Sequence, residues 1–321
     1  MSAIVEKVLA GDIRTVARLI SDIDDNMPEV RQTLKELYPH TGRAYIIGIT
    51  GAPGVGKSTL VDQMLSHLRK QEKTVGIIAV DPTSPFSGGA ILGDRIRMQR
   101  HSNDEGVFIR SFATRGHFGG LTRSTRSAID VMDAMGKDYI IVETVGVGQD
   151  EVEIVKSAHT TVITVMPGMG DDIQALKAGI LEVGDIFVIN KSDREGVDKT
   201  FNDLRLMLEL SQKRYVQGAW KPPVLKSEAI IDKGVAELLE EIENHGRYLM
   251  ESDGGMHLRR RKDRAREELA EMVKSRLIQE VFGSLTESGE FEKAVESIVE
   301  GKTDPYTATD DLVLPKLDLL A

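Results

Sequence analysis

The sequence contains no cysteine among its 321 residues. This absence excludes disulfide bonds, thiolate metal ligands and cysteine nucleophiles, and it fits a reducing, cytoplasmic setting. An excess of basic residues is also missing, because 41 Lys and Arg stand against 51 Asp and Glu, for a net charge of −10. Binding to nucleic-acid phosphates requires clusters of Lys and Arg in excess over Asp and Glu, so we expect no nucleic-acid partner.

Long hydrophobic runs are lacking as well. No apolar stretch approaches the roughly 20 residues that a helix needs to cross a bilayer, so we expect no membrane partner. The N-terminus has no basic segment followed by an apolar one, and no secretory signal is expected. With 40% hydrophobic and 29% charged residues, the composition is ordinary for a globular cytoplasmic protein.

Three segments with different patterns follow one another along the chain. Residues 2–38 predict helices with a break at Gly11-Asp12, whereas short β-branched runs alternate with helical stretches from residue 45 onward. Strand signals end near residue 245, and helices are predicted at 256–282 and 289–299 before an irregular tail. The β-branched runs are 45–50, 75–80, 107–110, 139–144, 161–166 and 185–190.

This alternation predicts an α/β fold with a mostly parallel, doubly wound sheet, flanked by N- and C-terminal helical extensions. The expected division is an N-terminal extension over 1–44, the α/β domain over 45–245 and a C-terminal arm over 246–321. The long helix of the arm has an apolar side that it cannot bury alone, which favours a partner or a second subunit.

The strongest motif is GAPGVGKST at residues 51–59, directly after the first strand and at the start of a helix. This is a P-loop in the context that confirms such a motif. Its glycines let backbone N–H groups surround a β-phosphate, and the helix N-terminus adds partial positive charge. Lys57 is expected to contact the β- and γ-phosphates and the Ser58 hydroxyl to coordinate Mg²⁺. The predicted contacts of this loop are Gly51, Ala52, Pro53, Gly54, Val55, Gly56, Lys57, Ser58 and Thr59.

The sequence NKSD at residues 190–193 predicts which base is bound. An Asp193 carboxylate can accept hydrogen bonds from guanine N1–H and the 2-amino group, whereas adenine would leave it unpaired. The stem of Lys191 is expected along the base, and Asn190 is expected to tie this loop to the phosphate side. The Ala229 N–H is a candidate donor to guanine O6, although an ordinary helix-to-strand connection explains that stretch nearly as well. The expected ligand is GTP rather than ATP.

Three carboxylates follow or lie near strand ends and would suit a hard cation such as Mg²⁺: Asp81, Asp94 and Glu143. Glu143 begins an ExxG sequence where many GTPases have DxxG. Val147 occupies the position at which small signalling GTPases carry a water-orienting Gln, and Gln149 follows two residues later. Hydrolysis is therefore expected to be slow without a partner. The glycine-rich stretches 86–93 and 167–172 are candidate switches or plain surface loops.

Eight motifs stand in order and resemble one family: GAPGVGKST, VDPTSP, GDRIRM, SFATRGHFGGL, VETVGVGQDE, MPGMGDDIQALKAG, NKSD and DPYTATDDL. They look like the GTPase chaperones of adenosylcobalamin-dependent methylmalonyl-CoA mutase, the MeaB/MMAA group. The same group has been called lysine-arginine-ornithine transport ATPases. The resemblance covers essentially the whole chain.

The resemblance implies a GTPase that uses GTP, GDP and Mg²⁺ and forms a homodimer through its C-terminal helices. It implies gating of cobalamin loading, and protection or reactivation of methylmalonyl-CoA mutase or a related cobalamin-dependent acyl-CoA mutase. Carried over by position, Lys57, Glu143 and Lys177 become the catalytic candidates, with Lys177 in the loop that the family uses as a third switch. One departure is Glu228-Ala229 where the family usually has Ser-Ala, so only the Ala229 backbone contact carries over.

Two other functions remain open from the sequence. A nickel or other metal-insertion GTPase shares the fold, but the chain lacks a His-rich tract or a Cys pair. A kinase or ATPase of amino-acid transport would need adenine, which Asp193 opposes.

Overall fold

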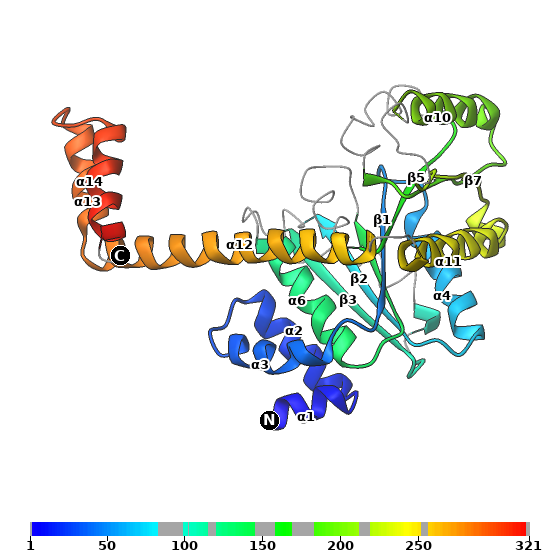
Figure 1. Cartoon of the computed structure of the whole chain (residues 1–321), viewed down its shortest axis with the longest axis horizontal. Coiled ribbons are helices and arrows are strands. Elements are labelled where there is room, and N and C mark those ends of the chain that lie inside the picture. Colours follow the sequence, from blue (N-terminus) through cyan, green and yellow to red (C-terminus); the bar gives the residue numbers. More distant parts are fainter. Residues whose placement is uncertain are drawn as a thin grey trace. The chain divides into compact units, whose positions relative to one another are not determined.

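Seven parallel strands form one sheet in the computed structural model, within the residues that it describes (Figure 1). Those residues are 2–82, 99–101, 103–114, 120–144, 158–168, 183–211, 219–251 and 256–318. The strands are β1 (Tyr45–Thr50), β2 (Val75–Pro82), β3 (Val107–Thr114), β4 (Tyr139–Thr144), β5 (Thr160–Val165), β6 (Ile186–Ile189) and β7 (Val224–Lys226). The predicted α/β fold class is confirmed, and the six β-branched runs are all strands.

The strand order, β3-β2-β4-β1-β5-β6-β7, places β1 in the centre. The chain runs from β1 to one side of the sheet and then returns to build the other side. In open parallel sheets, such a reversal leaves a crevice at the carboxyl ends of the strands, where ligands bind. The register sets Ile49 of β1 beside Glu143 of β4. The end of β4 therefore lies next to the segment that follows β1.

Helices cover both faces of the sheet, as the apolar character of the strands requires. On one face, α4 (Lys57–Lys70) and α11 (Val235–Glu251) pack against the sheet (Figure 1). The opposite face is covered by α6 (Gly120–Ala134) and α10 (Val197–Ser211). Since α4 begins at Lys57, the core on the first face fixes the helix that carries the P-loop lysine.

The N-terminal helices pack on α6 and belong to the same compact unit as the sheet (Figure 1). The predicted break at Gly11 is present, with a left-handed φ of 79°, and the Asp12 side chain caps the next helix by accepting from Thr15 N. The connection to β1 is held by the buried Asp133 carboxylate, which accepts from three backbone N–H groups at residues 42–44. These helices are α1 (Ala3–Leu9), α2 (Ile13–Asp24), α3 (Val30–Leu37) and the 3₁₀ turn η1 (Tyr38–His40).

Residues 252–321 form a second compact unit. Its described helices are α12 (Met256–Glu287), α13 (Glu290–Val299) and α14 (Pro305–Asp318). Leu285 is 2% exposed, and the rings of Phe282 and Phe291 lie 5.8 Å apart, so the helices share a small apolar core. No helix in the described ranges combines the length and apolar character that crossing a membrane requires.

The irregular tail predicted after residue 299 is wrong, because α14 is a helix of 14 residues. Its start is encoded locally: the Asp304 carboxylate accepts from the backbone N–H groups of Tyr306 and Thr307, at 2.9 and 3.0 Å. Pro305 then takes the first helical position, where its missing N–H costs nothing. Pro315 inside the helix is the residue that argues against this assignment from sequence.

Candidate nucleotide site

The P-loop connects β1 to α4 and is shaped by glycine at two close approaches. A Cβ on Gly51 would collide with the backbone carbonyl of Thr164, and a Cβ on Gly56 would collide with the Asn190 side-chain amide. Gly56 also has a left-handed φ of 99° as the residue that precedes α4. These positions let the loop lie against β5 and against the 190–193 segment, so the backbone can curl in front of the helix N-terminus.

Lys57 is 5% exposed and lies inside the curl of its own loop. Its Nζ donates to the carbonyl oxygens of Gly51, at 2.7 Å, and Ala52, at 3.0 Å. The ammonium group is thus held where the loop N–H groups and the helix N-terminus concentrate positive charge. A phosphate group is the chemistry that fits such a position.

Ser58 and Glu143 meet at the centre of the site. The Ser58 hydroxyl donates to Glu143 Oε1 at 2.7 Å, and the two residues are 5% and 1% exposed. Directly beside them, the buried Thr144 hydroxyl donates to the Thr50 hydroxyl at 2.8 Å. A buried carboxylate and a hydroxyl at the end of the phosphate loop are oxygen donors of the kind that Mg²⁺ prefers, so this pair fits the predicted metal site.

Asn190 joins the P-loop to the two segments predicted to contact the base. Its Nδ2 donates to the Val55 carbonyl at 2.9 Å, which is the link to the phosphate side expected from the sequence. Its Oδ1 accepts from the Ser227 hydroxyl and from the Ala229 N–H, both at 3.1 Å. One side chain that is 2% exposed therefore fixes three loops relative to one another.

Lys191 and Asp193 lie on the other side of this junction. Lys191 has a left-handed φ of 57°, and its Nζ donates to the Gly54 carbonyl at 2.7 Å, so its stem spans from the 190–193 segment to the P-loop. Asp193 is exposed. An exposed carboxylate next to the anchored lysine stem is free to meet the edge of a base lying along that stem, as the sequence predicts.

The base loop, defined here as residues 227–234, already uses the Ala229 N–H, which is the candidate donor to guanine O6. The Ala229 N–H already donates to Asn190 within the protein, so contact with guanine O6 would require sharing that donor. The loop is closed by an ion pair between Glu228 and Lys233, 2.5 Å apart, and is held to α4 by a 2.7 Å contact between Asp232 and His67. The Glu228 hydrogen bond raises the pKa of Lys233.

The remaining predicted site residues have a different status. Asp81 is the second-last residue of β2, at the carboxyl edge of the sheet, and its backbone pairs with Ala113 of β3. Asp94, Lys177 and the candidate switch stretch 86–93 lie outside the described residues, as do Val147 and Gln149. Their roles stay predictions. The structure therefore brings together Lys57, Ser58, Glu143 and the 190–193 segment.

Sequence reasoning missed the side chains that hold the base loop. His67, Asp232 and Lys233 carry no local signal, because His67 is 165 residues from its partner and the lysine sits in an ordinary-looking turn. The left-handed φ of 60° at Asp232 is also invisible in the sequence. A local signal that could have pointed to a tight turn is Gly234, whose φ of 79° favours glycine.

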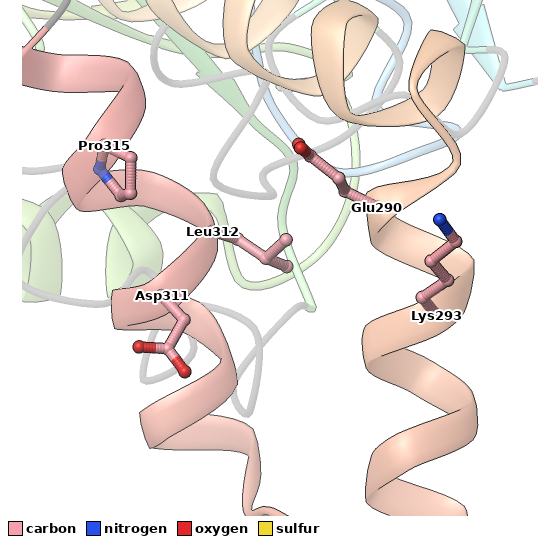
Figure 2. A pocket seen from close by; sticks show the side chains of 5 residues that line it. All are labelled: Glu290, Lys293, Asp311, Leu312 and Pro315. Carbon is pink, nitrogen blue, oxygen red and sulfur yellow. The ribbon is translucent and has the colours of Figure 1, made fainter.

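A cavity of about 280 Å³ lies elsewhere, in the second compact unit (Figure 2). Leu312 points from α14 toward α13, where Glu290 lies across the gap. The residues that line this cavity are Glu290, Lys293, Asp311, Leu312 and Pro315. None of the predicted nucleotide or metal residues contributes to it, so the candidate site stays at the carboxyl edge of the sheet.

A parallel sheet with a P-loop after its central strand, and an Asn-Lys-x-Asp segment joined to that loop, defines a P-loop GTPase. Comparison with known proteins agrees. The model of the methylmalonyl-CoA mutase-associated GTPase MeaB family matches residues 16–286. The chain belongs to this family, which confirms the resemblance seen in the sequence.

Individual relatives support the same placement. A Pyrococcus abyssi protein named as a GTPase is 49% identical over 307 residues, covering 96% of this chain and 94% of the relative. The mitochondrial methylmalonic aciduria type A homolog of Caenorhabditis elegans is 30% identical over 293 residues, covering 87% and 71%. A crystal structure of an LAO/AO transport system kinase shares the fold, with a TM-score of 0.68 and 24% identity over 96% of this chain and 95% of that one.

Proposed function

We propose that this chain binds and hydrolyses GTP with Mg²⁺, and that its nucleotide state gates adenosylcobalamin loading of methylmalonyl-CoA mutase or a related mutase. Protection or reactivation of that mutase belongs to the same proposal. The observation that carries the guanine assignment is the Asn190 junction, which sets Asp193 and the base loop at a fixed place relative to the P-loop. The family and the C. elegans relative support the choice of partner.

The described residues have separable tasks in hydrolysis. Lys57 needs only to exchange its two carbonyl acceptors for phosphate oxygens, because its Nζ already lies inside the loop. Ser58 and Glu143 would hold Mg²⁺, which supplies positive charge against the phosphates, with Asp81 and Asp94 as further oxygen donors. Lys177 is proposed to act in a switch that reports nucleotide state. Slow turnover by the chain alone follows from Val147.

A homodimer through the C-terminal arm belongs to the proposal. Four apolar residues of α12 that are 42–63% exposed follow one another along the helix at intervals of no more than four residues: Leu269, Met272, Val273 and Leu277. A stripe of this kind is costly to leave in water and matches a coiled-coil-like contact. The dimer is tested by comparing, with light scattering, the molar mass of the wild-type chain and of the double variant Leu269→Glu, Val273→Glu. An unchanged molar mass for the double variant would contradict this interface.

The base assignment is tested by exchanging Asp193. In Asp193→Asn, an amide nitrogen can donate to the 2-oxo group of xanthine, so affinity should shift from GTP toward xanthosine triphosphate. Competition binding with GTP, xanthosine triphosphate and ATP measures this shift. An unchanged base preference, or ATP binding as tightly as GTP in the wild type, would overturn the guanine assignment.

The partner assignment needs the cognate mutase. Purified mutase should raise the GTP turnover of this chain, and GTP should change the amount of complex that forms. Lys57→Ala serves as the control, because it should remove turnover while leaving the dimer intact. If the mutase leaves turnover unaltered and GTP has no influence on the complex, the chaperone role is wrong even if GTP hydrolysis stands.

A further inference from the structure

A charge pair closes the base loop, which lies beside the segment that carries Asp193. Glu228 Oε1 lies 2.5 Å from Lys233 Nζ. The backbones of the same two residues pair as well, with Glu228 N donating to Lys233 O at 2.9 Å and Lys233 N donating to Glu228 O. The side chain of Glu228 is only 14% exposed, whereas that of Lys233 is 68% exposed. A carboxylate that is mostly withdrawn from water thus depends on this lysine for its countercharge.

The loop that carries this pair has little freedom to move away. Ser192 N, in the 190–193 segment, donates to the Ser227 carbonyl at 3.0 Å. On the far side, Asp232 meets His67 of α4 at 2.7 Å. Gly234 has a φ of 79° and leaves no room for a side chain against the Lys226 carbonyl. Glu228 and Lys233 are therefore held close to the segment that carries Asp193.

Two carboxylates consequently share the side of the site predicted to receive the base. The hydrogen bond and the charge of Glu228 raise the pKa of Lys233, and the more distant charge of Asp193 adds to the same effect. Lys233 is therefore charged at neutral pH, paired with Glu228 and also attracted by Asp193. If Glu228 lost its partner, its charge would repel Asp193, and it could compete for the same donors on the base.

We propose that Lys233 is a positioning residue for base recognition: it keeps Glu228 within the loop and offsets its charge, so that Asp193 alone reads the guanine edge. This inference rests on the proposed guanine site. It also gives a role to the glutamate that departs from the usual Ser-Ala of the family.

The test measures nucleotide affinity of the full chain by calorimetry, for GDP and for inosine diphosphate, which lacks the 2-amino group. Lys233→Met should weaken GDP binding by about fivefold, a modest loss because the lysine is exposed and solvent screens its charge. The affinity for GDP should fall more than the affinity for inosine diphosphate, because only guanine offers a 2-amino group, and an aligned Asp193 is needed to accept the hydrogen bond from it. Lys233→Arg should retain both affinities.

The decisive variant is Glu228→Gln combined with Lys233→Met. Removing the acid should restore GDP affinity to near the wild-type value, which a merely structural role of Lys233 would not produce. Arg205→Met, which breaks an exposed ion pair with Glu209 on α10, is the matched control and should change nothing. The proposal would be overturned if the ratio of the affinities for GDP and inosine diphosphate were equal in the wild type and Lys233→Met. It would also be overturned if the double variant bound GDP as weakly as Lys233→Met. No GDP binding by the wild type would instead overturn the nucleotide site itself.

Discussion

Asn190→Ala is the substitution that most directly tests whether three loops share one anchor. The side chain makes hydrogen bonds of 2.9, 3.1 and 3.1 Å to Val55 O, Ser227 Oγ and Ala229 N. Alanine removes all of them while leaving the backbone bond from Asn190 N to Val165 O in place. The change is thus confined to the junction between the P-loop and the base loop.

The expected cost follows from what is left behind. The Ser227 hydroxyl can rotate toward another acceptor, but the Val55 carbonyl and the Ala229 N–H belong to buried residues and lose their partner. A buried polar group without a partner costs about 1–3 kcal/mol, so two of them give a loss of about 2–6 kcal/mol in the free energy of unfolding. For a unit of this size, each kcal/mol lowers the melting temperature by about 2–4 °C, so the melting temperature should fall by at least about 4 °C.

Urea unfolding followed by circular dichroism measures the stability, and GDP titration measures the functional effect. We expect GDP affinity to fall by at least about tenfold, because Asp193 and the base loop would no longer be aligned with the phosphate loop. Asn244→Ala is the matched control, since that half-buried asparagine makes only local contacts that the structure describes, with Glu241 and Arg247 of the same helix α11. Its loss should therefore cost much less than the loss of Asn190 and leave GDP affinity unchanged.

Two results would refute this reasoning. Stability equal to the wild type would mean that the buried partners find other acceptors and donors at no cost. A destabilised variant that still binds GDP with full affinity would show that base recognition does not depend on the junction.

Three further substitutions test other parts of the structure. Arg69 lowers the pKa of Asp104 through two 2.9 Å hydrogen bonds, so this pair stabilises the fold above the unfolded-state pKa near 3.8 and ceases to do so as the pH falls through the lower folded value. Asp104→Asn should therefore flatten the acid limb of the urea stability profile, and an unchanged limb would contradict the pairing. Leu285→Ala should destabilise the C-terminal unit by about 2–4 kcal/mol in a thermal melt, and an unaltered melt would argue against the buried contact. Asp304→Ala should lower the helical circular dichroism signal by fraying α14, whereas Asp310→Ala should leave it as it is.

The sequence predicted the elements whose signals are local. The P-loop, its helix and the runs of β-branched residues are written in adjacent residues, and each is present at the expected place. Asn190 was predicted to tie its loop to the phosphate side because its motif implies a partner in the P-loop. The helix α14 was missed although the signal for its start was local, because the Asp304-Pro305 start was overlooked; Pro315 inside the helix is a residue that argues against it.

Contacts between distant residues that belong to no recognisable motif were beyond sequence reasoning. Asp133 holds the connection at residues 42–44 from about 90 positions away, and His67 holds the base loop through Asp232. Neither contact produces a period, a spacing or a motif. The use of the Ala229 N–H by Asn190 is of the same kind, and it changes how guanine O6 could be contacted.

The sequence alone determined the fold class, the phosphate loop and the family of this protein, because short-range backbone requirements and hydrophobic periodicity are properties of neighbouring residues. Only the tertiary structure decided how the base loop is held, which acid is neutralised by Lys233 and where the buried Ser58–Glu143 pair forms. Those features depend on which strand ends and loops the sheet brings together, and burial then makes each unpaired charge or donor costly enough to fix its partner.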